Sequence, residues 1–76
     1  MQDKEEGEIV WNAVKQLPKF WAMAIILFYR EEKNLKEIAK IMRVRQNTVK
    51  TYLFRGRKRL KELLANVLGE DINVSG

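Results

Sequence analysis

Apolar residues along the chain recur at helical spacing in four stretches, and no stretch alternates as a strand would. In the first stretch, residues 9–17, they return every three to four positions and predict a short helix. Pro18 ends this helix and can open the next one, because proline is tolerated in a first helical turn. The second predicted helix spans residues 18–30 and includes ten consecutive apolar residues, Phe20 to Tyr29.

A third, shorter helix is predicted after the polar break at residues 31–33. Asn34 suits the N-cap position, and Glu37 lies three residues later, where the acid of a capping box belongs. The apolar positions that follow fall on one helix face, and they are Leu35, Ile38, Ala39 and Met42. This helix is therefore predicted to end near Met42.

The last and longest helix is predicted over residues 46–68, after a short connection at residues 43–45. At 1.5 Å per residue it would be about 35 Å long. Its apolar stripe comprises Val49, Leu53, Gly56, Leu60, Leu63, Leu64 and Val67. The sequence thus predicts an all-α, four-helix domain over residues 9–68, without a wing, between an acidic tail at 1–8 and a fraying tail at 69–76.

The composition fits one small soluble domain and excludes several kinds of chemistry. The 76 residues are 46% apolar and 33% charged, and they include neither cysteine nor histidine. Disulfides, zinc fingers and catalysis through imidazole or thiolate are therefore excluded. The sequence also has no glycine-rich phosphate loop and no metal-ligand cluster. We accordingly expect no enzymatic activity, no cofactor and no bound metal.

Targeting and membrane-spanning segments are not recognisable in the sequence. Met1 is followed by acidic residues rather than by a basic leader with an apolar core. The longest apolar run is too short to cross a bilayer, which requires about twenty residues. The expected location is the cytoplasm.

Charge is distributed unevenly along the chain, whose formal net charge is +5. Residues 1–8 hold four acids and one lysine, whereas the stretch from Lys40 to Lys61 holds nine basic residues and no acid. Such a block is a candidate phosphate-binding surface. A solvated helix face has the same composition, and charge alone does not separate these two interpretations.

The last two predicted helices have the form of a helix-turn-helix, in which a short amphipathic helix and a tight turn precede a longer basic helix. Ala39 is small where the two helices must cross, and Val44 is the apolar residue of the turn. The longer helix could then enter a major groove with its first residues at the base edges. A generic helical hairpin has the same periodicity, but it would not require polar residues at the start of its second helix. We therefore favour a DNA-binding module.

The ordered motifs of the chain resemble region 4 of bacterial sigma factors, above all the extracytoplasmic-function type. The motifs are Leu17-Pro18, Glu37-Ile38-Ala39, Thr48-Val49-Lys50 and Leu53-x-Arg55-Gly56-x-x-x-Leu60. Together they cover about residues 9–64. The helix-turn-helix of response regulators shares the second and third motifs, but its usual opening lacks the Leu-Pro step and its long helix rarely continues as Arg-x-Arg-Lys-Arg-Leu.

The resemblance implies recognition of the −35 promoter element by a domain docked on the β-flap of RNA polymerase and open to capture by an anti-sigma protein. Carried over by position, the residues at the element are Arg45, Asn47, Thr48, Lys50, Thr51, Phe54, Arg55 and Arg57. We extend this predicted DNA-binding set to Arg43, Gln46 and Lys58.

The chemistry of this predicted set suits DNA. Lys50 and Arg55 can bind phosphates or guanine acceptors, and Asn47 can pair with an adenine edge. The two threonines can donate hydrogen bonds to phosphates. Phe54 either packs on a sugar or a thymine methyl or fills the core, and the sequence leaves both open. The cations further along the helix are expected to contribute through charge alone.

Four positions depart from the pattern of the family that the chain resembles. Glu32 and Arg43 stand where glycine is common, and a turn that needs a positive φ at Arg43 would cost about 1 kcal/mol. Arg45 replaces the usual serine cap of the last helix, and Phe28 replaces a frequent DNA-contacting arginine. Arg43 and Arg45 add two cations at the turn, which could offset this cost by binding phosphates. Promoter preference is therefore expected to differ from that of typical relatives.

The ten-residue apolar run also predicts a protein partner. Because it covers every side of its helix, we expect part of the following set to stay exposed: Phe20, Trp21, Ala24, Ile25 and Phe28. Alternatively, Trp11 and the first helix cover most of this surface. The resemblance suggests the β-flap and an anti-sigma protein as partners, and the isolated domain is expected to be a monomer.

Two classes of function stay open at this point. The first is a sigma region 4 module that reads promoter DNA within polymerase. The second is a helical adaptor, or a stand-alone regulator of the response-regulator type, that acts mainly through protein contacts. The sequence lacks the promoter-melting region 2 of sigma factors, so the chain is either one domain of a longer protein or works beside a separate subunit.

Overall fold

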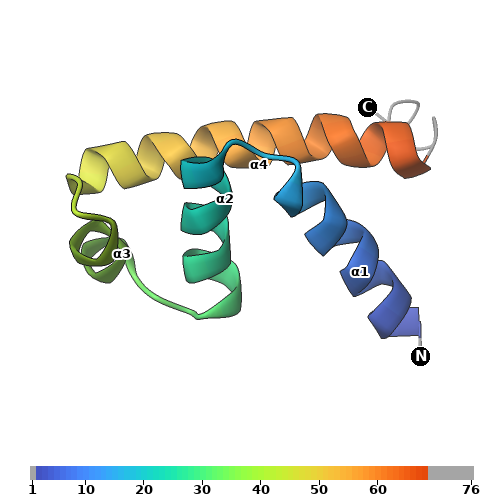
Figure 1. The fold of residues 1–76 in the computed structure, drawn as a ribbon, viewed down its shortest axis with the longest axis horizontal. Coiled ribbons are helices and arrows are strands. Elements are labelled where there is room, and N and C mark those ends of the chain that lie inside the picture. The colour runs from blue at the N-terminus through green and yellow to red at the C-terminus, as the bar shows by residue number, and fades with distance from the viewer. Residues whose placement is uncertain (1, 69–76) are drawn as a thin grey trace.

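The computed structural model describes residues 2–68, which form helices and turns and no strand (Figure 1). The elements are α1 (Gln2–Lys15), α2 (Lys19–Ile25), the π-helical η1 (Ile26–Arg30), α3 (Leu35–Met42) and α4 (Gln46–Leu68). The predicted all-α class is confirmed, and the bounds of the third and fourth helices agree with the prediction. The tail predicted at residues 69–76 lies outside the described residues. Within the described part, no helix combines the length and the apolar character that a bilayer crossing requires.

Helix α1 begins at Gln2, so the start predicted at residue 9 is too late and residues 2–8 are helical rather than a tail. This first part of α1 contains Gln, Lys and Glu, which are good helix formers but carry no apolar stripe. Hydrophobic spacing therefore could not detect these first two turns.

The second predicted helix exists but is not α-helical throughout. Pro18 occupies the N-cap with φ −52° and ψ 147°, as its fixed geometry allows. From Ile26 the helix widens into the π form, and the Glu31 amide donates to the Ile26 carbonyl at 3.1 Å. The rod then ends where the Lys33 amide donates to the Leu27 carbonyl at 2.9 Å.

Both ends of α3 are fixed by local chemistry. The Glu37 amide donates to the Asn34 side chain at 2.8 Å, and the Asn34 amide donates to the Glu37 carboxylate at 2.9 Å, so the predicted capping box is confirmed. At the other end, Arg43 adopts φ 59° and ψ 47°. The Val44 amide then reaches the Ala39 carbonyl at 3.0 Å. The turn into α4 thus needs the left-handed conformation that favours glycine.

Helix α4 is the common packing partner of the other helices, which lie along one side of it in Figure 1. The core consists of Ala13, Val14, Leu17, Ala24, Ile25, Ile38, Ala39, Val49 and Leu53. At Gly56 a Cβ atom would lie 3.0 Å from Cγ1 of Ile25, so the absent side chain lets α2 approach α4 closely. Packing on this one face leaves the opposite face of α4 open to a ligand.

Candidate nucleic-acid interface

The turn after α3 determines where α4 begins. The Arg45 carbonyl accepts hydrogen bonds from the Thr48 and Val49 amides at 3.0 and 3.1 Å, which starts the helix at Gln46. The guanidinium of Arg45 contains only donors, so unlike serine it cannot accept a hydrogen bond from the first amides of α4. Arg43 and Arg45 are both exposed here. Two cations therefore flank the entry to the helix.

Beyond this entry, α4 separates its apolar side from a polar side. Val49 and Leu53 are 0% and 2% exposed, whereas the side chains on the opposite side are open to solvent. We call this open side the polar face and define it by Asn47, Lys50, Thr51 and Arg55. At about 100° per residue these four positions fall within an arc of about 140°. One ligand could therefore meet all four.

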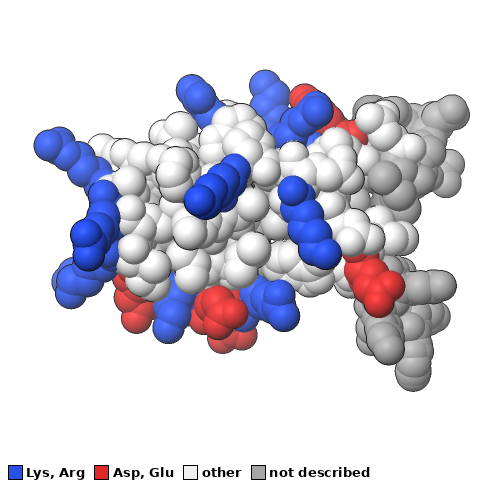
Figure 2. Space-filling view, viewed as in Figure 1, with Lys and Arg blue, Asp and Glu red and all other residues white. Residues whose placement is uncertain are grey.

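The predicted DNA-binding residues are almost all at the surface. Thr48 is half-buried, and the exposed members are Arg43, Arg45, Gln46, Asn47, Lys50, Thr51, Phe54, Arg55, Arg57 and Lys58. In Figure 2 basic side chains are spread along α4 and around its first end, while acidic ones lie mostly on the lower edge and toward the far end. Among the described residues the one ion pair joins Arg59 and Glu62 at 2.9 Å. The cations of the polar face are thus unpaired within the described part of the chain.

Three members of the predicted set have a more specific environment than the sequence indicates. The Thr51 hydroxyl donates to the Asn47 carbonyl at 3.1 Å, so donation to a phosphate would require this bond to break. Phe54 is 66% exposed, which excludes the core-filling alternative. Arg57 donates from Nη1 to the hydroxyl of Tyr29. It is therefore bound to η1 rather than aligned with the polar face.

The predicted partner surface is only partly exposed. Phe20 is 53% exposed and stacks on Tyr52 with ring centroids 6.1 Å apart. Ala24 and Ile25 are 0% and 2% exposed, so the expectation that they belong to an open surface is wrong. Both are part of the core, and Ile25 packs against Gly56 of α4. The ten apolar residues have no hydrophobic periodicity, so their sequence does not indicate which side of the helix is buried. Packing of α2 against the other helices determines that side.

Trp21 and Phe28, the remaining members of the predicted partner surface, are half-buried against the core. Phe28 meets Tyr29 edge to face at 4.9 Å. Trp11 lies beneath the Arg30 guanidinium, whose carbon is 5.6 Å from the ring. Aromatic and cationic side chains thus cover much of this region, which leaves Phe20 as the exposed large side chain of the predicted set.

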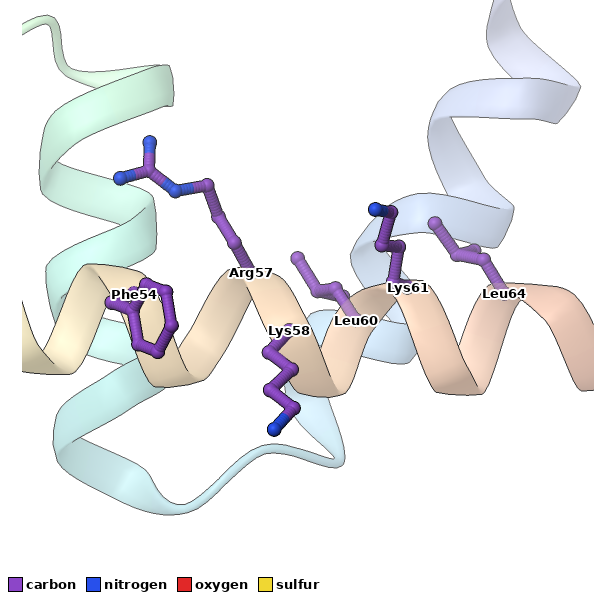
Figure 3. A pocket seen from close by; sticks show the side chains of 6 residues that line it. All are labelled: Phe54, Arg57, Lys58, Leu60, Lys61 and Leu64. Carbon is purple, nitrogen blue, oxygen red and sulfur yellow. The ribbon is translucent and has the colours of Figure 1, made fainter. Parts of the chain in front are cut away.

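An open hollow of about 550 Å³ lies along α4 between Phe54 and Leu64, and the sequence did not predict it. We call it the α4 hollow, and Figure 3 shows its lining of Phe54, Arg57, Lys58, Leu60, Lys61 and Leu64. Leu60 and Leu64 are half-buried, although the apolar stripe placed them in the core. The leucine spacing alone does not reveal this, because it depends on how far the other helices extend along α4.

Comparison with known proteins identifies the family. The model of the family described as Sigma-70, region 4 matches residues 7–60, more than half of the chain. The chain is also 38% identical over 59 residues to the ECF RNA polymerase sigma factor SigM of Bacillus subtilis (strain 168). That match covers 78% of this chain and 36% of the relative, so the chain spans about a third of the relative's length. With its helix-turn-helix formed by α3 and α4, the chain belongs to the Sigma-70 region 4 family.

Proposed function

We propose that this domain binds the −35 element of promoter DNA by placing the first half of α4 in the major groove. The observation that carries this proposal is the polar face, which is exposed and has no acid of the described residues paired to it. From Gln46 to Arg55 the helix extends about 14 Å. A major groove about 12 Å wide admits an α-helix, whose diameter with side chains is about 10–12 Å, and the first residues of that helix can then reach the base edges.

Each group on this part of α4 has a chemical role in the proposal. Lys50 and Arg55 bind guanine acceptors or phosphates, and Asn47 reads an adenine edge through its amide. Arg43 and Arg45 contact phosphates beside the groove, since they lie at the turn and not on the polar face. The cations at the turn fix the register, and the polar face supplies the sequence preference.

The magnitude of binding fits a module of a larger assembly. A single helix-turn-helix buries only about 600–1,000 Å² on DNA. Four to six phosphate contacts give a slope of about +4 to +5 in log Kd against log salt, because affinity falls as salt rises. Binding by the domain alone should therefore be weak, about micromolar at physiological salt. Tethering to polymerase raises the local concentration enough for such contacts to suffice.

Docking on the β-flap of RNA polymerase is the second part of the proposal, and we assign it to the α4 hollow. The hollow combines leucine and phenylalanine side chains with three flanking cations, a composition suited to an apolar protein segment. Its first lining residue, Phe54, lies about 12 Å from the start of α4, and its two leucines lie about 20 Å or more from it, beyond the part of the helix that the groove receives. The relative named above is described as an RNA polymerase sigma factor, which supports this partner.

Capture by an anti-sigma protein would use the exposed Phe20 and its stacking partner Tyr52. At about 100° per residue, Tyr52 faces a side of α4 different from that of Arg57, which lines the hollow. The two protein surfaces are therefore separate, and Phe20→Ala should weaken anti-sigma capture without affecting docking at the hollow.

The test of DNA binding is a fluorescence-anisotropy titration of the 76-residue chain with −35-like and scrambled duplexes at two salt concentrations. We expect at least tenfold tighter binding to one of the −35-like duplexes, equivalent to about 1.4 kcal/mol. Equal affinity for all duplexes would reject sequence recognition. Negligible affinity for every duplex, together with retained capture of a protein partner, would favour the adaptor alternative.

A further inference from the structure

Tyr29 and Arg57 form a contact that joins η1 to α4. The Arg57 Nη1 donates a hydrogen bond of 2.5 Å to the Tyr29 hydroxyl, and the guanidinium carbon lies 5.9 Å from the centre of the tyrosine ring. The contact thus combines a hydrogen bond with a cation–π interaction. Figure 3 shows Arg57 extending toward the rod of α2 and η1, whereas Lys58 points to another side of α4.

The π-helical turn of η1 determines which neighbouring helix Tyr29 faces. A π turn contains more residues than an α turn, so it changes which side chains of η1 face the neighbouring helices. Phe28 packs edge to face on Tyr29, and the next residue, Arg30, lies over Trp11 of α1. Tyr29 and Arg30 are successive residues of η1, and they therefore contact two different helices, α4 and α1. The Tyr29 ring is held from one side by Phe28 while its hydroxyl reaches Arg57.

We propose that Tyr29 is a positioning residue that holds Arg57 at the edge of the α4 hollow and keeps it out of the phosphate-binding set. This inference rests on the proposed DNA-binding function. Without Tyr29, Arg57 would be a long, freely rotating cation next to Lys58 and within reach of the DNA backbone. With Tyr29, one N–H is occupied and the guanidinium lies against the tyrosine of η1.

The consequence is a division among the cations of α4. Lys50 and Arg55 bind the DNA, while the charged group of Arg57 lines the α4 hollow and does not contact phosphates. The guanidinium retains its other N–H donors for a carboxylate of a protein docked there. The domain therefore makes one phosphate contact fewer than its number of basic residues suggests, and its affinity for DNA is correspondingly lower.

The test measures the salt dependence of duplex binding for the full chain and four variants. Each phosphate contact contributes about 0.9 to the slope of log Kd against log salt. We expect Arg55→Ala, the control for a true contact, to lower the slope by about 0.9, and Arg57→Ala to leave it unchanged. Tyr29→Phe should raise the slope by about 0.9 and tighten binding, and adding Arg57→Ala should restore the parent slope.

A lowered slope in Arg57→Ala, or an unchanged slope in Tyr29→Phe, would overturn the inference. If the parent chain binds no duplex at all, the proposed function is wrong instead, and a second measurement still decides the role of Tyr29. That measurement is ¹⁵N NMR of the Arg57 guanidinium. Restricted rotation about its Nε–Cζ bond in the parent and free rotation in Tyr29→Phe are expected, and equal rotation in both would refute the positioning role.

Discussion

The two halves of α4 differ in what they present to the outside, although they share one continuous core face. The first half carries amide, hydroxyl and cationic groups on its exposed side, at Asn47, Lys50 and Arg55. The second half carries half-buried leucines, Leu60 and Leu64, within a hollow flanked by cations. A single helix thus offers a surface suited to DNA and, at leucines about 20 Å or more from its start, another suited to protein. Each half can be altered separately.

The largest effect is expected from removing the two cations of the first half. Lys50→Ala combined with Arg55→Ala should weaken binding to the −35-like duplex by about 2 kcal/mol or more, because both contacts to bases or phosphates are lost. The salt slope should fall by about 1.8. The melting temperature should not change, since both side chains are exposed. Anisotropy titration and thermal unfolding measure these quantities.

The matched control for this variant is Lys15→Ala combined with Lys19→Ala. It removes the same charge from exposed positions near the α1–α2 connection, away from the helix-turn-helix. We expect it to lose much less affinity than the first variant. Equal losses in the two would show that net charge, and not the polar face, determines DNA binding.

The next effect in size concerns the second half of the helix. Leu64→Glu places a carboxylate in the α4 hollow and should weaken capture of the isolated β-flap domain about tenfold, or 1.4 kcal/mol. Binding to DNA should change little. Asn66→Glu adds the same charge at an exposed position outside the hollow and serves as the control. A pull-down or calorimetric titration that found equal capture by the two variants would contradict the assignment of the hollow.

A smaller effect is expected at the two non-glycine residues with positive φ. Glu32 and Arg43 have φ values of 58° and 59°. Replacing either with glycine should stabilise the domain by about 1 kcal/mol, which corresponds to about 4–8 °C in melting temperature. Only Arg43→Gly should also weaken DNA binding, and combining it with Arg45→Ser should weaken it further. Arg43→Gly with unchanged affinity would show that the cation at the turn does not contact DNA.

The smallest effect is expected at the capping box of α3, which lies outside both halves of α4. Glu37→Gln keeps the bond back to the Asn34 amide but removes a negative charge from the first turn of α3. The free energy of unfolding should fall by about 0.5 kcal/mol. Duplex binding and flap capture should both stay the same, and a change in either would indicate that α3 does more than support α4.

Features determined by neighbouring residues were predictable from the sequence. Asn34 and Glu37 specify the start of α3 through hydrogen bonds between residues three positions apart. The positive φ at Arg43 follows from the turn that a helix-turn-helix requires. The exposure of the polar face follows from the periodic apolar stripe that begins at Val49. In each case a few adjacent positions contain the necessary information.

Features that depend on packing between distant segments were not predictable. The apolar run from Phe20 to Tyr29 has no period, so its sequence does not distinguish buried Ile25 from exposed Phe20. The α4 hollow depends on how the other helices pack along α4. The contact of Tyr29 with Arg57 joins residues 28 positions apart through a π turn that no sequence pattern indicates.

An NMR titration of the ¹⁵N-labelled chain with the −35-like duplex tests most directly whether the first half of α4 enters DNA while the second half stays outside. We predict large amide shift changes from Gln46 to Arg55 and at the turn, with little change from Leu60 to Leu64. Changes concentrated from Leu60 to Leu64, or none at duplex concentrations that should saturate the domain, would contradict this division of the helix.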